Sequence, residues 1–526
     1  MSTASVTDRE KINAADVLLE RGLSEFSGAN PAILSDKISV SYAELDAAAC
    51  RAGHAMRTFD VQPGDRVLIM ADDRPEFFYA YLGAMKIGAV PVSLNLRFSS
   101  GNLSHVIEDS ACKLFLADAQ FVDVCQQAMV KLKSTPAFAL IDTPCRDFPV
   151  FPELMDSQPD TLQSYLLGPD DMALWMYTSG TTGESKAVVH RQSSTLTIDR
   201  YLGTVYGVGP GDRIFCSSKL FFAFSLGHSL LASLRLGATT VLHTGWPTAE
   251  AVAAVVERHK PDVVLSVPTL YRALLKENLA GSEGFARVRH FISAGEHLPK
   301  ALSDKWMMAT ANPILQGIGA TEALIMFIGN RPDDNRPGAT GKPFPGTKVK
   351  LVGESGELIS ETGIPGVLWV HSDSVAVQYW NQEAKSEQVF KEGWYVTGDV
   401  FFRDEDGFYH YQGRDDDMLK ISGQWVSPAE IEEYVLKCPD VSDAAVIGVA
   451  DSSGLVRLAL CLIPARPNVD HEALRKELTD TLTSSLSIYK CPRRFIFLDE
   501  MPQTATGKTQ RFKLRQIAAD HLEPAS

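Results

Sequence analysis

The segment "MALWMYTSGTTGESK", residues 172–186, joins a short apolar run to a loop of small and hydroxyl-bearing residues. The apolar run has the length of a buried strand. The loop carries four Ser or Thr residues between positions 178 and 182, together with two glycines, and it ends at Lys186. Small residues let backbone N–H groups approach phosphate oxygens, and a lysine adds a mobile positive charge. This order is typical of a polyphosphate site at the end of a strand.

The loop departs, however, from the usual nucleotide-binding loop. The pattern G-x-x-x-x-G-K-[ST] requires glycine before the lysine and Ser or Thr after it. Here those two positions are Ser185 and Ala187. Two interpretations therefore stay open from these residues alone. The loop either binds phosphate with another geometry or is a flexible turn, since Gly, Ser and Thr clusters usually mark turns.

Composition limits the classes of function. The chain has 526 residues, of which 45% are hydrophobic, and this predicts several compact units with large cores. The formal net charge of −15 argues against a nucleic-acid partner, because neutralising phosphates requires a basic surface. The longest apolar stretch is interrupted by Lys86 and is shorter than a membrane span, and the N-terminus lacks the apolar core of a signal peptide. Eight cysteines without a C-x-x-C pair indicate reduced thiols, so we expect a cytoplasmic protein with no membrane partner.

The order of strand-like and helix-like segments predicts the fold. A capping box at Ser41 to Glu44 opens a helical pattern, and strands and helices then alternate over about the first 340 residues. This alternation is typical of parallel sheets wrapped by helices, an α/β class. Near Thr340 the pattern changes to short strands with Gly and Pro turns, as in an antiparallel or barrel-like unit. We expect a large N-terminal domain over residues 1–413 and a small, mobile α+β domain over residues 414–526.

Four further stretches have the chemistry of a nucleotide site. "GIGATE" places Glu322 in a glycine turn, where a carboxylate beside phosphate would suit Mg²⁺. "WYVTGDV" places Asp399 on a turn, where it could accept hydrogen bonds from ribose hydroxyls. "GRDDDMLKISG" offers Arg414, and "QTATGKTQR" offers Lys508 near the C-terminus. Taken singly, each stretch also fits an ordinary turn, a solvated linker or a surface lysine.

Taken together and in this order, "YTSGTTGESK", "GIGATE", "YVTGD", "GRDDDMLKISG" and "TATGK" resemble the motifs of the adenylate-forming acyl-CoA ligase family. That family includes luciferase-like enzymes and the adenylation domains of peptide synthetases. The resemblance covers essentially the whole chain. It implies an enzyme, an AMP-forming acid–thiol ligase that uses ATP, Mg²⁺ and coenzyme A, with a small C-terminal domain turning about a hinge.

The resemblance also implies a role for particular residues. It assigns nucleotide binding to Thr178, Ser179, Gly180, Thr181, Thr182, Gly183, Lys186, Ala294, Gly295, Glu296, Ile318, Gly319, Thr321, Asp399, Arg414 and Lys508. It assigns catalysis to Lys508, Glu322, Thr321 and Lys420, the metal to Glu322, the hinge to Asp416, and coenzyme A to Gly423 and Lys490. In this scheme Lys508 bridges the substrate carboxylate and ATP during adenylation, whereas Lys420 acts in the second half-reaction.

The physical reasons for these roles are consistent. A carboxylate that attacks a phosphate brings two anions together, so Lys508 and Mg²⁺ must offset their repulsion. The acyl-adenylate is a mixed anhydride, so the site should exclude water. Thioester formation then requires Lys508 to leave and a thiol to enter, which a hinged domain allows.

Within the family, "KLFFAFSLGHSL" and "GIGATEALIMFIGNRP" most resemble the benzoate- and anthranilate-CoA ligases. That branch implies an acid pocket lined by Phe222, Ala223, Phe224, Gly317, Gly319, Leu324 and Ile325. Phe224 stands where relatives often have tyrosine, and Ile325 where they often have histidine. Because both differences remove polar groups, we expect an apolar aryl acid such as benzoate rather than a hydroxylated or amino-substituted one. A cyclic or medium-chain acid is the competing prediction.

The acceptor has two alternatives. Coenzyme A is expected for the branch, and "YKCPRRF" places Lys490, Arg493 and Arg494 where its phosphates could be met, although Cys491 interrupts this basic run. The alternative is the phosphopantetheine arm of an acyl or aryl carrier protein. A non-catalytic, ligand-binding member of the fold would be expected to lose its charged catalytic groups, and this chain keeps them. We expect a monomer or a homodimer.

Overall fold

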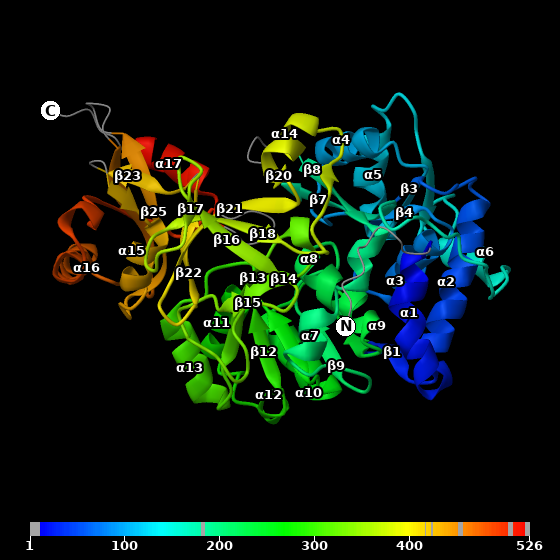
Figure 1. The fold of residues 1–526 in the computed structure, drawn as a ribbon, viewed down its shortest axis with the longest axis horizontal. Coiled ribbons are helices and arrows are strands. Elements are labelled where there is room, and N and C mark those ends of the chain that lie inside the picture. The colour runs from blue at the N-terminus through cyan, green and yellow to red at the C-terminus, as the bar shows by residue number, and fades with distance from the viewer. Residues whose placement is uncertain are drawn as a thin grey trace.

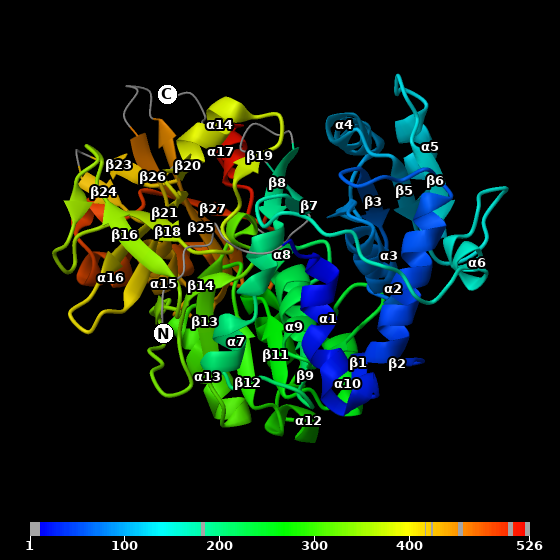
Figure 2. The ribbon, with the colours of Figure 1, turned by 45° about the vertical axis from the view of Figure 1, so that its right-hand side comes forward.

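The chain forms two mostly parallel sheets, an antiparallel sheet and a small C-terminal α+β unit (Figure 1). The structure is a computed structural model, and it describes residues 11–179, 185–415, 417–421, 424–450, 456–502 and 509–520. The C-terminal unit lies at the end of the molecule opposite the first sheet, with the antiparallel sheet beside it (Figures 1 and 2).

The first sheet has seven strands in the order β19-β8-β7-β4-β3-β5-β6, and β8 and β19 run antiparallel to their neighbours. Its strands are β3 Arg66–Met70, β4 Val90–Ser93, β5 Leu114–Ala117, β6 Ala137–Leu140, β7 Met172–Ser179, β8 Ser185–Arg191 and β19 Gln378–Tyr379. The accompanying helices are α2 Tyr42–Arg57, α3 Pro75–Lys86, α4 Ser100–Ser110, α5 Val122–Met129 and α6 Phe151–Asp156. The expected capping box is present, since the Ser41 hydroxyl accepts from the Glu44 N–H while the Glu44 side chain accepts from the Ser41 N–H.

Both faces of this sheet are buried. Along β3, Val67 and Ile69 belong to one apolar cluster, with α2 and α3, and Leu68 and Met70 belong to another, with α4 and α5. Successive side chains of a strand point to opposite faces, so an uninterrupted apolar strand needs helices on both sides. The predicted helix-wrapped parallel sheet is confirmed.

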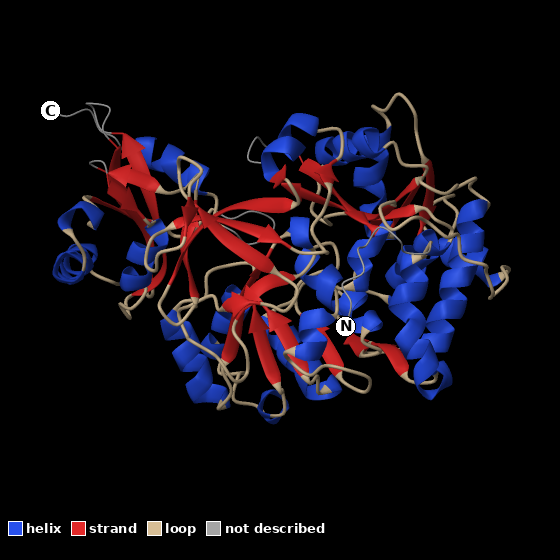
Figure 3. Cartoon of the chain, viewed as in Figure 1, coloured by secondary structure: helices blue, strands red, loops and turns tan. Residues whose placement is uncertain are grey.

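The second sheet has nine strands in the order β15-β14-β13-β12-β11-β9-β10-β1-β2, parallel from β13 to β1. Its strands are β1 Pro31–Leu34, β2 Ser39–Ser41, β9 Arg213–Cys216, β10 Thr239–Val241, β11 Val263–Ser266, β12 His290–Ser293, β13 Ile314–Gly319, β14 Met326–Gly329 and β15 Lys342–Pro343. Helices cover both faces of this sheet (Figure 3). They are α1 Ala14–Ser24, α7 Arg200–Thr204, α8 Ala223–Ser225, α9 Ser233–Arg235, α10 Ala249–His259, α11 Pro268–Lys276, α12 Glu283–Ala286 and α13 Lys300–Thr310.

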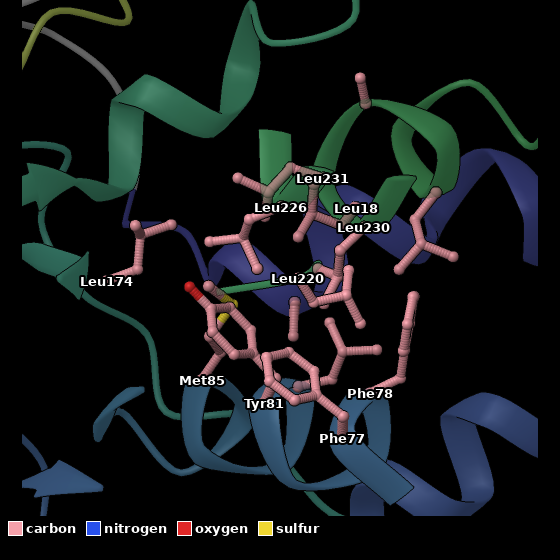
Figure 4. Close-up of a cluster of buried hydrophobic side chains, with 14 of the residues drawn as sticks. Leu18, Phe77, Phe78, Tyr81, Met85, Leu174, Leu220, Leu226, Leu230 and Leu231 are labelled. Atoms are coloured by element: carbon pink, nitrogen blue, oxygen red, sulfur yellow. The ribbon is translucent and has the colours of Figure 1, made fainter. Parts of the chain in front are cut away.

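One apolar cluster joins the two parallel sheets. Figure 4 shows Leu18 of α1, the aromatic side chains of α3, and Leu226, Leu230 and Leu231 gathered between the sheets. These leucines lie on a π-helical segment, Leu226–Ala232, that continues α8. The segment that was predicted to line the acid pocket is therefore anchored in the core shared by both sheets.

The antiparallel sheet has the order β17-β16-β18-β21-β20, with β22 paired to β21. Its strands are β16 Lys348–Val352, β17 Leu358–Ile359, β18 Gly366–His371, β20 Phe390–Lys391, β21 Trp394–Arg403 and β22 Tyr409–Arg414, and helix α14 Glu383–Val389 precedes β20 in the chain. The change from parallel to antiparallel pairing occurs where the sequence pattern changed.

The C-terminal unit has a hairpin, a three-stranded sheet and three helices. Its elements are β23 Leu419–Ile421, β24 Gln424–Val426, α15 Pro428–Val435, β25 Val441–Ala450, β26 Val456–Pro464, α16 His471–Ser485, β27 Arg494–Phe497 and α17 Arg511–Asp520. Its two apolar clusters contain only residues from Leu419 onward. The predicted α/β class with a smaller α+β unit is confirmed. No helix in the described ranges combines the length and the apolarity needed to cross a membrane.

Candidate active site

The predicted phosphate loop lies between the two paired strands β7 and β8. β7 pairs antiparallel with β8, so that Thr178 lies opposite Lys186 and Ser179 opposite Ser185. Residues 180–184, which include four of the predicted phosphate-binding positions, lie outside the described residues. The lysine is thus held by the pairing of a returning strand, whereas in the usual nucleotide loop it begins a helix.

Glu322 lies across from this lysine, in the turn between β13 and β14. Its carboxylate is buried and accepts hydrogen bonds from the hydroxyl of Tyr379 at 2.6 Å and from that of Tyr395 at 3.2 Å. The Lys186 Nζ lies 3.7 Å from Glu322 Oε1 and 3.8 Å from the centre of the Tyr379 ring. Burial lowers the pKa of Lys186, and Glu322 acts in the opposite direction. A buried carboxylate needs donors of this kind to remain charged.

The backbone of this turn is supported from β8. The Nε2 of His190 lies 2.9 Å from the Thr321 carbonyl oxygen, and since a carbonyl only accepts, Nε2 carries the proton. Burial lowers the pKa of His190 to about 4, so the imidazole is neutral near neutral pH. On the other side, the Ala376 N–H donates to the Glu322 carbonyl oxygen at 2.7 Å. These bonds hold the Thr321–Glu322 turn from β8 on one side and from the segment before β19 on the other.

Asp399 and Arg414 are brought together as the sequence suggested. They are paired residues on β21 and β22, and the Arg414 Nη1 lies 3.3 Å from Asp399 Oδ1. The same nitrogen donates to the Thr397 carbonyl oxygen at 2.7 Å. Gly398, which lies between Thr397 and Asp399 in the chain, has φ +71, and an added Cβ there would lie 2.7 Å from Arg414 Nη2. A glycine is needed at this position for both reasons.

The remaining nucleotide candidates follow neighbouring strands of the second sheet. Ala294, Gly295 and Glu296 come directly after β12, and Ile318 and Gly319 end β13, which pairs with β12 in parallel. The carboxyl ends of adjacent parallel strands meet at one edge of a sheet, the usual place for ligands in such folds.

The predicted acid-binding segments also meet. Ala223 and Phe224 pack against the cluster that contains Leu324 and Ile325. Gly227 approaches so closely that a Cβ there would lie 2.2 Å from the Leu324 carbonyl oxygen. Leu324 itself has φ +63, a conformation that non-glycine residues rarely adopt and that is often found at functional sites.

Three other residues that were predicted to line the acid pocket have different neighbours from those of Ala223 and Phe224. Phe222 stacks at a tilt on Phe221, with ring centres 4.1 Å apart. The missing side chains of Gly317 and Gly319 point toward β14, where added Cβ atoms would meet Met326 Sδ and the Ile325 carbonyl oxygen, each at 2.7 Å. These two glycines therefore permit the close pairing of β13 with β14.

Several predicted residues are not placed with this cluster. Lys508, Asp416 and Gly423 lie outside the described residues, and for Lys420 only the backbone on β23 is described. Lys490 forms an ion pair with Glu430, with Nζ–O distances of 2.8 and 2.6 Å.

Sequence reasoning missed the tyrosines and the histidines. Tyr379 lies outside the quoted motifs, Tyr395 lies within "WYVTGDV" without an assigned role, and His190 looks like an ordinary strand residue. A second buried histidine, His228, bonds to Tyr201 and lies 2.5 Å from the Phe224 carbonyl oxygen. Local signals existed for Tyr395 and His228, which fall within the quoted "WYVTGDV" and "KLFFAFSLGHSL" segments.

Comparison with known proteins places the chain in a class of nucleotide-dependent enzymes. The model of the AMP-binding enzyme family matches residues 20–380, and that of the AMP-binding enzyme C-terminal domain matches residues 430–508. The chain belongs to the AMP-binding enzyme family, so the family resemblance read from the motifs is confirmed.

Individual relatives are aryl-CoA ligases. The chain is 44% identical over 506 residues to the 3-hydroxybenzoate–CoA ligase of Aromatoleum sp. (strain CIB), covering 96% of this chain and 97% of that protein. It is 36% identical over 508 residues to the benzoate–CoA ligase of Thauera aromatica, covering 96% of each. Among solved structures, the anthranilate CoA ligase AuaEII in complex with anthranoyl-AMP superposes with a TM-score of 0.92 at 32% identity, covering 98% of this chain and 100% of that one.

Proposed function

We propose that this chain is an acid–thiol ligase that activates a benzoate-like aryl carboxylic acid with ATP. The first half-reaction forms an acyl-adenylate and releases pyrophosphate, and the second transfers the acyl group to coenzyme A, giving an aryl-CoA thioester. The observation that carries this proposal is the buried cluster of Lys186 and Glu322, beside the Asp399–Arg414 pair, in a chain similar over nearly its whole length to aryl-CoA ligases.

In this proposal, different residues bind the phosphates, the base and the ribose of ATP. The 178–186 hairpin, with Lys186 on its returning strand, binds the β- and γ-phosphates. Thr321 contacts the α-phosphate, and Ala294–Glu296 and Ile318–Gly319 border the base. Asp399 accepts hydrogen bonds from the ribose hydroxyls, and Arg414 holds its carboxylate in place. This arrangement places a cation and hydrogen-bond donors where phosphate charge must be offset.

The residues present fit one Mg²⁺ carried by the triphosphate. In the described part of the chain, no group of three or more His, Cys, Asp or Glu side chains could hold a metal ion. Mg²⁺ is commonly bound by one or two carboxylates together with substrate phosphates and water, and Glu322 supplies one carboxylate. When bound, the ion would neutralise part of the phosphate charge.

In this proposal, rotation of the small C-terminal domain about its hinge switches the site from the first half-reaction to the second. We propose a boundary at 413/414 and a hinge at Asp416, with Lys508 serving adenylation and Lys420 serving thioester formation. The separate apolar clusters of the C-terminal unit support this division. For Lys490 to bind coenzyme A beside Gly423, it must exchange its pair with Glu430 for a phosphate.

Two aryl acids compete as the preferred substrate. The apolar side chains of Phe224 and Ile325, both in the cluster at the proposed pocket, favour benzoate. The 44% identity to a ligase named for 3-hydroxybenzoate favours that acid instead. Acid-dependent pyrophosphate release should be measured with both acids and with cyclic and medium-chain acids. Absence of release with every acid would refute the proposed function.

The acceptor is tested in the same assay. Coenzyme A and a holo-carrier protein are offered separately, and the thioester is detected by mass spectrometry. We expect product with coenzyme A, and product with the carrier alone would replace this acceptor. We also propose a cytoplasmic location, which is supported by the eight cysteines all being free thiols.

A further inference from the structure

Tyr379 is placed beside the phosphate lysine by strand pairing. β19 pairs antiparallel with β8, so that Tyr379 lies opposite Val188. Lys186 and Val188 share one face of β8 because side chains alternate along a strand. Tyr379 is therefore the diagonal cross-strand neighbour of Lys186, within reach of a long side chain. Its backbone N–H is also held by the Ser386 hydroxyl of α14 at 2.9 Å.

This tyrosine contacts both charged groups of the site at once. Its hydroxyl donates to Glu322 Oε1 at 2.6 Å, and the Lys186 Nζ lies 3.8 Å from the centre of its ring. The lysine and the carboxylate form a long ion pair at 3.7 Å, beyond ordinary hydrogen-bond distance. The second carboxylate oxygen is occupied by the Tyr395 hydroxyl at 3.2 Å. Both oxygens of Glu322 are therefore bonded to phenols, while the ammonium rests on an aromatic face.

The alternative arrangement would be a short Lys186–Glu322 pair, with the ammonium hydrogen-bonded to the carboxylate. Charge-assisted pairs of this kind are short and strong, and breaking one leaves a buried charge without a partner. Such a pair would have to open before the lysine could bind phosphate and the carboxylate could bind a metal ion. A neutral hydroxyl on Oε1 and a ring under Nζ hold the two groups close together without a hydrogen bond between them.

We propose that Tyr379 is a positioning residue that keeps the long Lys186–Glu322 ion pair from closing to hydrogen-bond distance, so that the lysine serves the triphosphate and the carboxylate serves its metal ion. This inference rests on the proposed function. The proposal gives the two parts of the Tyr379 side chain different roles: the ring acts on Lys186, and the hydroxyl acts on Glu322.

The test compares Tyr379→Phe with Tyr379→Leu. Binding of a non-hydrolysable ATP analogue is measured by calorimetry, first without divalent cations and then with Mg²⁺. The Phe variant keeps the ring, so its metal-free affinity should match the wild type while the gain in affinity on adding Mg²⁺ falls roughly tenfold. The Leu variant loses ring and hydroxyl, so its metal-free affinity should also fall roughly tenfold.

Tyr81→Phe is the matched control, because it removes a buried hydroxyl on α3 that has no hydrogen-bond partner among the described residues. It should leave both binding constants unchanged. The inference is overturned if both Tyr379 variants match the wild type, or if the Phe variant loses as much metal-free affinity as the Leu variant. If the Leu variant does not fold, the Phe variant alone decides through its Mg²⁺ effect. A wild-type protein that binds no nucleotide would instead refute the proposed function.

Discussion

Gly227→Ala tests whether the two walls of the proposed acid pocket depend on close backbone contact. A Cβ at this position would lie 2.2 Å from the Leu324 carbonyl oxygen and 3.6 Å from Ile325 Cγ2, whereas Cβ atoms are essentially never found closer than 3.0 Å to such a neighbour. Either the π-helical segment or the 324–325 backbone must therefore move. Leu324 already has φ +63 and follows Glu322 closely, so it has little freedom to adapt.

The Gly227→Ala substitution has two effects of opposite sign on the free energy of unfolding. Alanine has a higher helix propensity than glycine, which alone would stabilise the protein by up to about 1 kcal/mol. Overpacking a well-filled core costs about 1–3 kcal/mol. Because the contacted atom is backbone and cannot rotate away, we expect the steric effect to exceed the propensity effect, with a net loss of about 1 kcal/mol or more.

The assay combines denaturant unfolding with steady-state kinetics. Displacing the 324–325 segment should raise the KM for the aryl acid and lower kcat roughly tenfold or more, while the KM for ATP changes little. Gly101→Ala on α4 is the control, since the nearest atom to its added Cβ is Ser99 Oγ at 3.8 Å. That variant should be as stable as the wild type and fully active. A Gly227→Ala enzyme with unchanged stability and unchanged acid KM would show that the reasoning is wrong.

Three further predictions concern the chemistry and its pH dependence. Lys508→Ala should suppress adenylate formation but spare thioester formation from supplied acyl-adenylate, and Lys420→Ala should do the reverse; equal loss of one half-reaction in both variants would contradict the domain rotation. Ile325→His should shift kcat/KM toward hydroxy- or amino-substituted benzoates, and an unchanged substrate profile would remove this residue from the pocket. Burial lowers the pKa of His190 to about 4, so the folded state binds fewer protons than the unfolded state between pH 4 and the ordinary histidine pKa of 6.5. Stability should therefore fall as the pH drops through this window, by up to about 1.4 kcal/mol per pH unit from this group, and His190→Gln should flatten the slope of denaturant stability against pH.

The elements that the sequence predicted well are those with strong local patterns. α2 begins where the Ser41 capping box placed it, and the predicted alternation of strands and helices appears, for example, as α10, β11 and α11. These patterns depend on periodicity and on hydrogen bonds between residues a few positions apart. The pairing of Asp399 with Arg414 also follows from neighbouring strands of one antiparallel sheet.

Other features of the site had no local signal. The hairpin that carries Lys186 could be read only as a strand and a loop, because nothing nearby indicated whether a helix or a strand would follow. Tyr379 lies nearly two hundred positions further along the chain, in a two-residue strand too short to have a recognisable pattern.

By itself, the amino-acid sequence determined the order of the elements, the apolar faces that must be covered, and the set of charged groups available for chemistry. Only the tertiary structure decided that Tyr379 contacts both Lys186 and Glu322, and that Gly227 meets the backbone of Leu324. The reason is physical. Caps and periodicity act over a few residues, whereas contacts between sheets depend on how whole units bury their apolar faces against one another.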